Sequence, residues 1–285
     1  MRGIAIIAAL LILVGCANSR PYLRDPSPTE RRASADRIAA AHKMQPIKLE
    51  TKRFILSSWW RIHKIGEPVT VYIEGDGLAW ADRTEPSTNP TPIEAVALNL
   101  AALDASANVV YIARPCQFDG IVSIDCNRTY WTDGRFAREV IDAYDEALTA
   151  IHATVKSSKI RLVGYSGGGS IALLVAAQRN DVMDVRTVAS NIDHKTWTNL
   201  HELLPLSRSL NPADFSARLT NIPQMHWVGD GDEVMPRTVA DAYQKRFADP
   251  SCINVKTITA VGHSSGWMEQ WPNLAATPVT CALKK

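Results

Sequence analysis

Along the chain, segments with the apolar pattern of buried β-strands alternate with segments that have the amphipathic spacing of α-helices. Val69–Ile73 is an apolar, β-branched run that predicts a buried strand, Lys159–Gly164 is expected to be another strand, and Phe136–Val155 has the amphipathic spacing of a long helix. Further strands are expected at Lys48–Leu56, Asn108–Ala113, Val185–Ser190, Ile222–Val228 and Ile253–Thr259, and further helices at Ile93–Leu103, Ser170–Gln178, Thr238–Phe247 and Trp267–Leu274. Strands and helices in turn predict an α/β fold, with a mostly parallel central sheet covered by helices on both faces.

Composition narrows the class of protein. The 285 residues are 46% hydrophobic and 21% charged, which excludes a disordered chain and a protein with many membrane spans. Lysine and arginine number 31 against 29 acidic residues, and the formal net charge is +2. This balance, with no basic patch or finger motif, gives no reason to expect a nucleic-acid partner.

The N-terminus has the pattern of an export signal. A positive start is followed by the apolar run Ile4–Val14, which is too short to span a bilayer. Leu13-Val14-Gly15-Cys16 resembles the lipobox of bacterial lipoproteins, so residues 1–15 are expected to be a signal peptide and Cys16 the lipidated first residue. Ala17 follows rather than Asp, and the resemblance then favours an outer-membrane lipoprotein facing the periplasm. Residues 16–45 are interpreted as a tether with a short helix around 33–41, and residues 46–285 as one domain.

The remaining cysteines are even in number. Of five cysteines, removing Cys16 leaves Cys116, Cys126, Cys252 and Cys281. In an oxidising compartment two disulfides are expected, and three pairings are open. We favour Cys116–Cys126 with Cys252–Cys281, because both pairs are local in sequence. A metal site is not expected, since no Cys-x-x-Cys motif or histidine cluster is present.

Gly164-Tyr165-Ser166-Gly167-Gly168 carries the main chemical signal. It fits Gly-x-Ser-x-Gly, a tight strand-to-helix turn that exposes the serine hydroxyl. The apolar strand before it and the Ala- and Leu-rich helix after it supply the required context. A phosphate-binding loop or a plain turn is the alternative, but no lysine follows at the Walker A position.

With this motif the chain resembles the α/β-hydrolase family from about residue 50 onward. The resemblance implies a triad in the order serine, acid, histidine. His263, in a small-residue loop after the last predicted strand, is the expected base, whereas His226 begins a strand and is interpreted as structural. The turn Gly229–Pro236 is similar to the family's G-x-x-D-x-V-x-P, which assigns the acid to Asp232; Asp193 is the alternative.

The resemblance also implies an oxyanion hole made of two backbone N–H groups. Gly167, directly after the serine, is expected to supply one. The second is expected from Glu74-Gly75-Asp76-Gly77, which stands where many relatives have His-Gly-x-Gly; we choose Asp76, with Gly77 as the alternative. A plain glycine-rich turn is the structural interpretation of this segment. The loop Arg114–Gln117 is expected either at the rim of the site or in a purely structural role.

Together these features predict a serine carboxylesterase that needs no cofactor or metal. About 30 residues separate the strand ending near Asp193 from the next one, which allows a small cap and disfavours an interfacial lipase. The expected partners are a small acyl ester and, through the lipid, a membrane; we expect a monomer. The alternatives are a thioesterase, a peptidase, and a non-catalytic envelope lipoprotein that uses the fold for binding.

Overall fold

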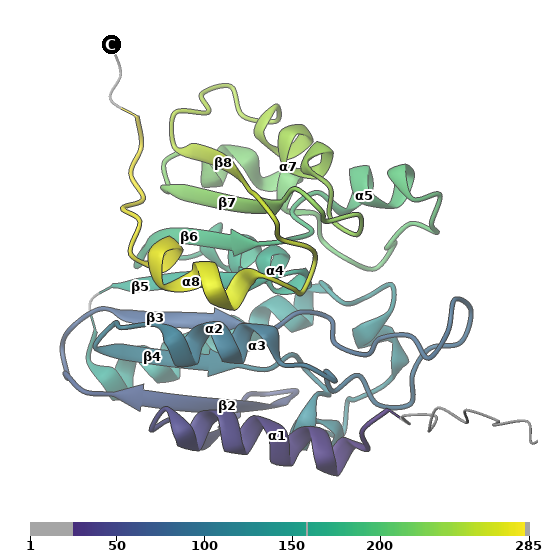
Figure 1. Cartoon of the computed structure of the whole chain (residues 1–285), viewed down its shortest axis with the longest axis vertical. Helices are drawn as coiled ribbons and strands as arrows, with labels where there is room; N and C mark the ends of the chain where they lie inside the picture. Colours follow the sequence, from purple (N-terminus) through teal and green to yellow (C-terminus); the bar gives the residue numbers. More distant parts are fainter. Residues whose placement is uncertain (1–24, 158, 283–285) are drawn as a thin grey trace, which may run out of the picture.

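The computed structural model describes residues 25–157 and 159–282. Its single sheet has eight strands in the order β1-β2-β4-β3-β5-β6-β7-β8 (Figure 1). The strands are β1 (Gln45–Glu50), β2 (Ile55–Ile62), β3 (Val69–Ile73), β4 (Asn108–Ile112), β5 (Ile160–Tyr165), β6 (Val182–Val188), β7 (Gln224–Gly229) and β8 (Ile253–Ile258). β3 to β8 are parallel, and β1 and β2 pair antiparallel at one edge. The predicted α/β architecture is confirmed.

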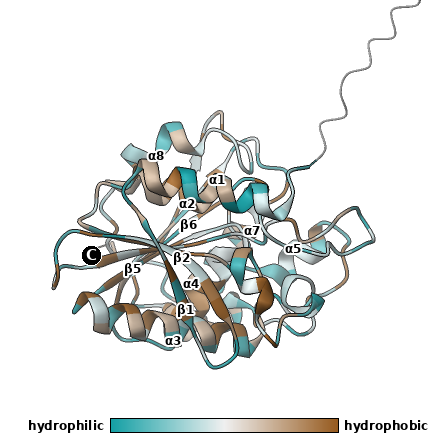
Figure 2. Ribbon diagram, turned by 90° about the horizontal axis from the view of Figure 1, so that it is seen from below, coloured by the Kyte–Doolittle hydropathy of each residue, from teal (hydrophilic) through white to brown (hydrophobic). Residues whose placement is uncertain are grey.

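Helices cover both faces of the sheet (Figure 2). The helices are α1 (Pro28–Ala41), α2 (Val96–Leu103), α3 (Arg138–Val155), α4 (Gly167–Ala176), α5 (His194–Leu200), α6 (Ser216–Leu219), α7 (Arg237–Gln244) and α8 (Trp267–Ala275), with 3₁₀ turns at Phe118–Val122, Arg128–Trp131 and Pro212–Phe215. One apolar core contains the buried faces of α3, α4 and α7, and the other contains those of α1, α2 and α8. Between β6 and β7 stand only short helices, in agreement with a small cap.

One predicted strand was wrong, because it contains a turn. The run Lys48–Leu56, expected as a single strand, is divided between β1 and β2 by a turn in which Thr51 N–H donates to Phe54 O at 2.9 Å. Leu49, before the turn, and Phe54 and Leu56, after its start, are all buried, so the apolar pattern does not reveal the reversal.

The segment expected as a tether is folded where the structure describes it. α1 starts at a capping box made by Ser27 and Glu30, which satisfies backbone N–H groups at the helix start. Ala35 and Ala39 pack into the core, and Asp36 accepts a hydrogen bond from Trp59 Nε1 at 3.0 Å. α1 is therefore longer than the helix expected around 33–41, and it packs against the sheet. No helix in the described ranges combines the length and apolarity needed to cross a bilayer.

Candidate active site

Ser166 lies in a sharp turn between β5 and α4, with φ 49° and ψ −121°. An L-residue rarely adopts such angles, and holding it there costs about 1–3 kcal/mol. Glycines make the turn possible: a β-carbon at Gly164 would fall 2.4 Å from Gly169 Cα, and one at Gly168 would fall 2.2 Å from Ile73 O. Ser166 N–H also donates to Val188 O at 2.9 Å, which ties the turn to β6. The geometry matches the turn predicted from the glycine and serine pattern.

His263 and Asp232 come together with Ser166 from two other loops. His263 Nε2 lies 3.2 Å from Ser166 Oγ, and His263 Nδ1 lies 3.0 Å from Asp232 Oδ2. The Asp232 carboxylate is buried and accepts the N–H groups of Val234 at 3.0 Å and Met235 at 2.8 Å. The structure thus forms a continuous chain of polar contacts from carboxylate to imidazole to hydroxyl.

Asp193, the alternative acid, and His226, expected to be structural, both have partners outside the site. Asp193 caps α5, where it accepts hydrogen bonds from Thr196 Oγ1 at 2.9 Å and Asn211 Nδ2 at 2.9 Å. His226 is buried beside Thr187 Oγ1 at 2.8 Å, and burial lowers the pKa of its imidazole to about 3. His226 therefore stays neutral inside the sheet, which fits the structural interpretation.

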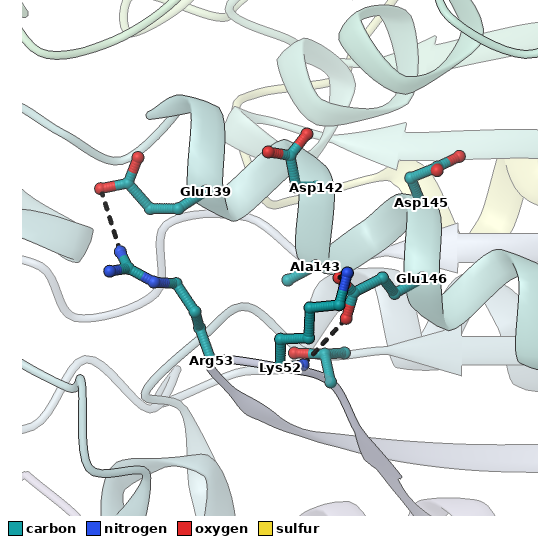
Figure 3. Close-up of a pocket in the computed structure, with 8 residues that line it drawn as sticks. Lys52, Arg53, Glu139, Asp142, Ala143, Asp145 and Glu146 are labelled. Atoms are coloured by element: carbon teal, nitrogen blue, oxygen red, sulfur yellow. Dashed lines mark hydrogen bonds and ion pairs between the residues drawn. The ribbon is translucent and has the colours of Figure 1, made fainter.

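A cavity of about 240 Å³ opens beside Ser166 and His263. It is lined by Glu74, Asp76, Gly77, Leu78, Ile93, Glu94, Val96, Tyr165, Ser166, His263 and Ser264. Sequence analysis did not single out Leu78, Ile93, Glu94 and Val96, because the segment from Leu78 to the start of α2 carries no motif that shows which side chains line a cavity. A larger hollow between α3 and the β1–β2 turn contains surface charges that pair with one another, including Lys52 with Glu146 and Arg53 with Glu139 (Figure 3).

The residues of the two candidate donors, Gly167 and Asp76, lie near Ser166. Gly167 is the first residue of α4, so its N–H has no acceptor within the helix. Asp76 lies in the loop after β3, and this loop packs on the serine turn: a β-carbon at Gly75 would be 3.1 Å from Ser166 Cβ. The structure thus brings both predicted oxyanion residues close to the serine.

Glu74, where relatives are expected to have His, is buried under the start of α2. Its carboxylate accepts hydrogen bonds from Gly75 N–H at 2.9 Å, Ala97 N–H at 3.3 Å and Tyr111 Oη at 3.0 Å. Burial raises its pKa to about 7, although these donors oppose the shift. The residue ties the loop after β3 to a helix N-terminus.

The Asp76 carboxylate sits between two buried arginines. Arg114 Nη1 lies 2.7 Å from Asp76 Oδ1, and Arg135 Nη1 lies 2.5 Å from Asp76 Oδ2. Burial alone would raise the pKa of Asp76, but the charges of Arg135 and Arg114 outweigh it and lower this pKa below its usual value. Sequence analysis left the loop of Arg114 open between the rim of the site and a structural role, and it missed Arg135, which belongs to no recognisable motif.

The structure contains the disulfides Cys116–Cys126 and Cys252–Cys281, the pairing favoured from sequence. The first closes residues 116–126, which follow Arg114 in the segment after β4. The second joins the start of β8 to the C-terminal segment. Cys16, the expected lipidation site, lies outside the described residues.

Comparison with known proteins identifies the fold. No family model matches the chain, and no curated protein matches its sequence. Among solved structures, a putative lipase (lip1) from Acinetobacter baumannii AYE aligns with a TM-score of 0.56 at 14% identity, covering 88% of this chain and 93% of that one. Est1E from Butyrivibrio proteoclasticus aligns with a TM-score of 0.54 at 13% identity, covering 81% and 95%. Proline iminopeptidase from Mycobacterium smegmatis aligns with a TM-score of 0.58 at 11% identity, covering 81% and 95%. The chain has the α/β-hydrolase fold.

Proposed function

We propose that the protein is a serine hydrolase that cleaves acyl esters through an acyl-enzyme intermediate. The observation that carries the proposal is the contact chain from Asp232 through His263 to Ser166, at 3.0 and 3.2 Å. A neutral imidazole at this distance can accept the hydroxyl proton, and a buried carboxylate stabilises the imidazolium that forms. Structural neighbours described as an esterase from Pyrococcus furiosus, a naproxen esterase from Bacillus subtilis and a putative lipase support this class of reaction.

In the proposed mechanism Ser166 Oγ bonds to the acyl carbon while its proton passes to His263 Nε2. The carbonyl π electrons move to the oxygen, and the N–H groups of Gly167 and Asp76 stabilise that charge. When the carbonyl reforms, the C–O bond to the alcohol breaks and the leaving oxygen takes the proton from His263. Water then attacks the acyl-enzyme with His263 as base, and collapse of this second intermediate returns the proton to Ser166 Oγ and releases the acid.

The cavity favours a compact substrate. A volume of about 240 Å³ is smaller than the ~300–1,000 Å³ of drug-sized ligand sites, and the cap over it is short. We therefore propose esters with a modest acyl group. A p-nitrophenyl ester series should show kcat/KM falling from short to long acyl chains, and a strong preference for long chains would contradict this size limit.

A fluorophosphonate probe tests the nucleophile. Wild-type protein should be labelled at Ser166, and Ser166→Ala should not be labelled. Absence of wild-type labelling, or equal labelling of Ser166→Ala, would favour the alternative of a non-catalytic binding protein.

Two carboxylates provide a matched test of the acid. Asp232→Asn should lower kcat by about 10²- to 10⁴-fold, since an amide cannot hold the imidazole in the required tautomer with a compensating charge. Asp193→Asn, at the cap of α5, should leave kcat near the wild-type value. The reverse result would assign the acid to Asp193.

Amide hydrolysis is the second candidate, because one neighbour is described as a proline iminopeptidase. The same triad can cleave thioesters, esters and amides. Parallel assays with a matched ester, thioester and anilide of one acyl group would rank the three activities.

We further propose that lipid on Cys16 anchors the protein to the outer membrane, facing the periplasm. The start of the described chain lies at the edge of the sheet that carries Ser166 (Figure 1). There Arg31 Nη1 donates to Thr91 O at 2.8 Å, and Arg32 pairs with Asp119 at 2.5 Å, in the loops after β3 and β4. Most exposed large apolar side chains of the described residues belong to the loops and helices that follow the strands at this edge: Trp80, Ile93, Val122, Ile124, Leu200, Leu203, Leu204, Val234 and Met268. The position of the chain start and these exposed apolar side chains support an orientation with this edge of the sheet toward a lipid surface.

Fractionation of cells tests the anchor. Wild-type protein should be found with the outer membrane and should incorporate labelled fatty acid, whereas Cys16→Ser should be released and unlabelled. Ala17→Asp should move the protein to the inner membrane. Membrane retention of unlabelled Cys16→Ser would contradict a lipid anchor.

A further inference from the structure

Gln117 is a wholly buried side chain directly under the loop that carries Asp76. Its Nε2 donates to Gly75 O at 3.0 Å, and its Oε1 accepts the N–H of Arg114 at 3.1 Å. The amide is therefore held at both ends. Because the Arg114 N–H can only donate, the oxygen of the amide must face it, and the NH₂ group must face Gly75.

This contact fixes the direction of one peptide. Gly75 O and the N–H of Asp76 belong to the same peptide group, and the described residues contain no cis peptide, so the two point in opposite directions. With Gly75 O held by Gln117, the Asp76 N–H points away from Gln117. We propose that Gln117 is a positioning residue, which locks this peptide so that the Asp76 N–H meets the carbonyl oxygen of the bound ester. The inference rests on the proposed esterase function.

The loop around Gln117 is held in an unusual conformation. Cys116 and Phe118, on either side of it, have φ values of 69° and 51°. Each left-handed non-glycine residue costs about 1–2 kcal/mol, so the conformation persists only where the surroundings hold it. The Cys116–Cys126 disulfide and the hydrogen bond from Phe118 N–H to Thr91 Oγ1, at 2.6 Å, provide that hold. The strained backbone at Cys116 and Phe118 thus holds the Gln117 side chain against Gly75 O.

Gly77, next to Asp76, also packs closely against Gln117. Gly77 has φ 65°, and a β-carbon there would lie 2.7 Å from Gln117 Nε2 and 2.1 Å from Pro90 O. The Gln117 amide thus contacts the loop on both sides of Asp76. The Asp76 carboxylate is fixed independently by Arg114 and Arg135, so backbone and side chain of this residue are each restrained.

Two substitutions separate positioning from packing. Gln117→Met keeps the size of the side chain and removes its donor. We expect kcat for a p-nitrophenyl ester to fall about 10- to 100-fold, because loss of an aligned oxyanion donor costs up to about 10²- to 10³-fold, while KM stays near the wild-type value. Gln117→Glu cannot donate when ionised, but its protonated form can donate to Gly75 O and accept from Arg114. The ratio of its kcat to the wild-type kcat should therefore rise as the pH is lowered from 9 to 6, whereas the ratio for Gln117→Met should stay constant.

Gln224 offers a matched control. It is also wholly buried, and its Nε2 donates to a backbone carbonyl, Leu219 O, at 2.9 Å, but it stands at the opposite end of the sheet, at the start of β7. Gln224→Met should lower thermal stability as Gln117→Met does and should keep the wild-type kcat. Wild-type kcat in Gln117→Met, or equal losses of kcat in both variants, would overturn the positioning role.

Fluorophosphonate labelling of the same samples separates the two proposals. A labelled wild type with an unimpaired Gln117→Met variant leaves the proposed function in place and rejects only the role of Gln117. A wild type that is neither labelled nor active on esters rejects both.

Discussion

The Asp76 carboxylate lies against the Cα of Gly167, so that a β-carbon at position 167 would fall 2.1 Å from Asp76 Oδ1. The carboxylate cannot move aside, because Arg114 and Arg135 hold both of its oxygens. Gly167→Ala should therefore displace either the loop after β3 or the start of α4. We expect kcat for ester hydrolysis to fall at least about 10²-fold, the effect of losing one oxyanion donor.

Gly231→Ala is the control for this substitution. A β-carbon at Gly231 would lie 3.4 Å from Val261 O, an ordinary contact distance, so most of the activity should remain. Steady-state kinetics of both variants check the prediction, and full activity in Gly167→Ala would show that the loop adapts to the added carbon.

Asp76→Asn should destabilise the fold. Within the described residues, Asp76 is the only acidic side chain that forms an ion pair with Arg114 or Arg135. The substitution therefore leaves two buried guanidinium groups without a counter-ion. Removing one partner of a buried ion pair costs about 3–5 kcal/mol. Urea unfolding at pH 7 should show a loss of about that size, while Asp142→Asn, which breaks an exposed pair with Arg138, should change stability by less than about 1 kcal/mol.

The same pair predicts an acid dependence. The pKa of Asp76 is lower in the folded protein than in the unfolded chain, so its stabilising effect is present above the unfolded pKa of 3.8 and is lost as the pH falls through the folded pKa. The stabilities of wild type and Asp76→Asn should therefore approach each other below about pH 4. A constant difference down to acid pH would contradict this assignment.

Sequence patterns predicted those features of the molecule that depend on common local motifs. The period of β3 and α3 and the glycines around Ser166 follow from local geometry that many chains share. The order of Ser166, Asp232 and His263 was predicted from the resemblance to the α/β-hydrolase family. Arg135 and Gln117 could not be assigned in the same way, because their roles depend on contacts with Asp76 and Gly75, far away in sequence. The turn between β1 and β2 was missed because Leu49, Phe54 and Leu56 around it are all buried, although β1 is otherwise exposed, so the apolar pattern continues through the turn.

Glu74 predicts a stability change near neutral pH. Its pKa is about 7 in the folded protein against 4.5 in the unfolded chain, so folding favours the protonated carboxyl. The stabilising effect is complete below the unfolded pKa and is lost as the pH rises through about 7, an effect of about 3 kcal/mol. Since Glu74→Gln does not titrate, its stability relative to wild type should improve by about this amount between pH 4.5 and pH 8. Urea unfolding across this range measures the difference, and parallel profiles would exclude a proton on Glu74 as the cause.

The two disulfides should differ in what they do for activity. By loop-closure entropy, Cys116–Cys126, with a separation of 10 residues, contributes about 3 kcal/mol, and Cys252–Cys281, with a separation of 29, about 4 kcal/mol. Only the first holds the left-handed residues beside Gln117. Cys126→Ser should therefore lower both stability and kcat, the latter by about 10-fold or more if the Asp76 N–H is released. Cys281→Ser should lower the melting temperature by a similar amount with an unchanged kcat when assayed well below it. Equal kcat in the two variants would show that the loop after β4 keeps its conformation without the disulfide.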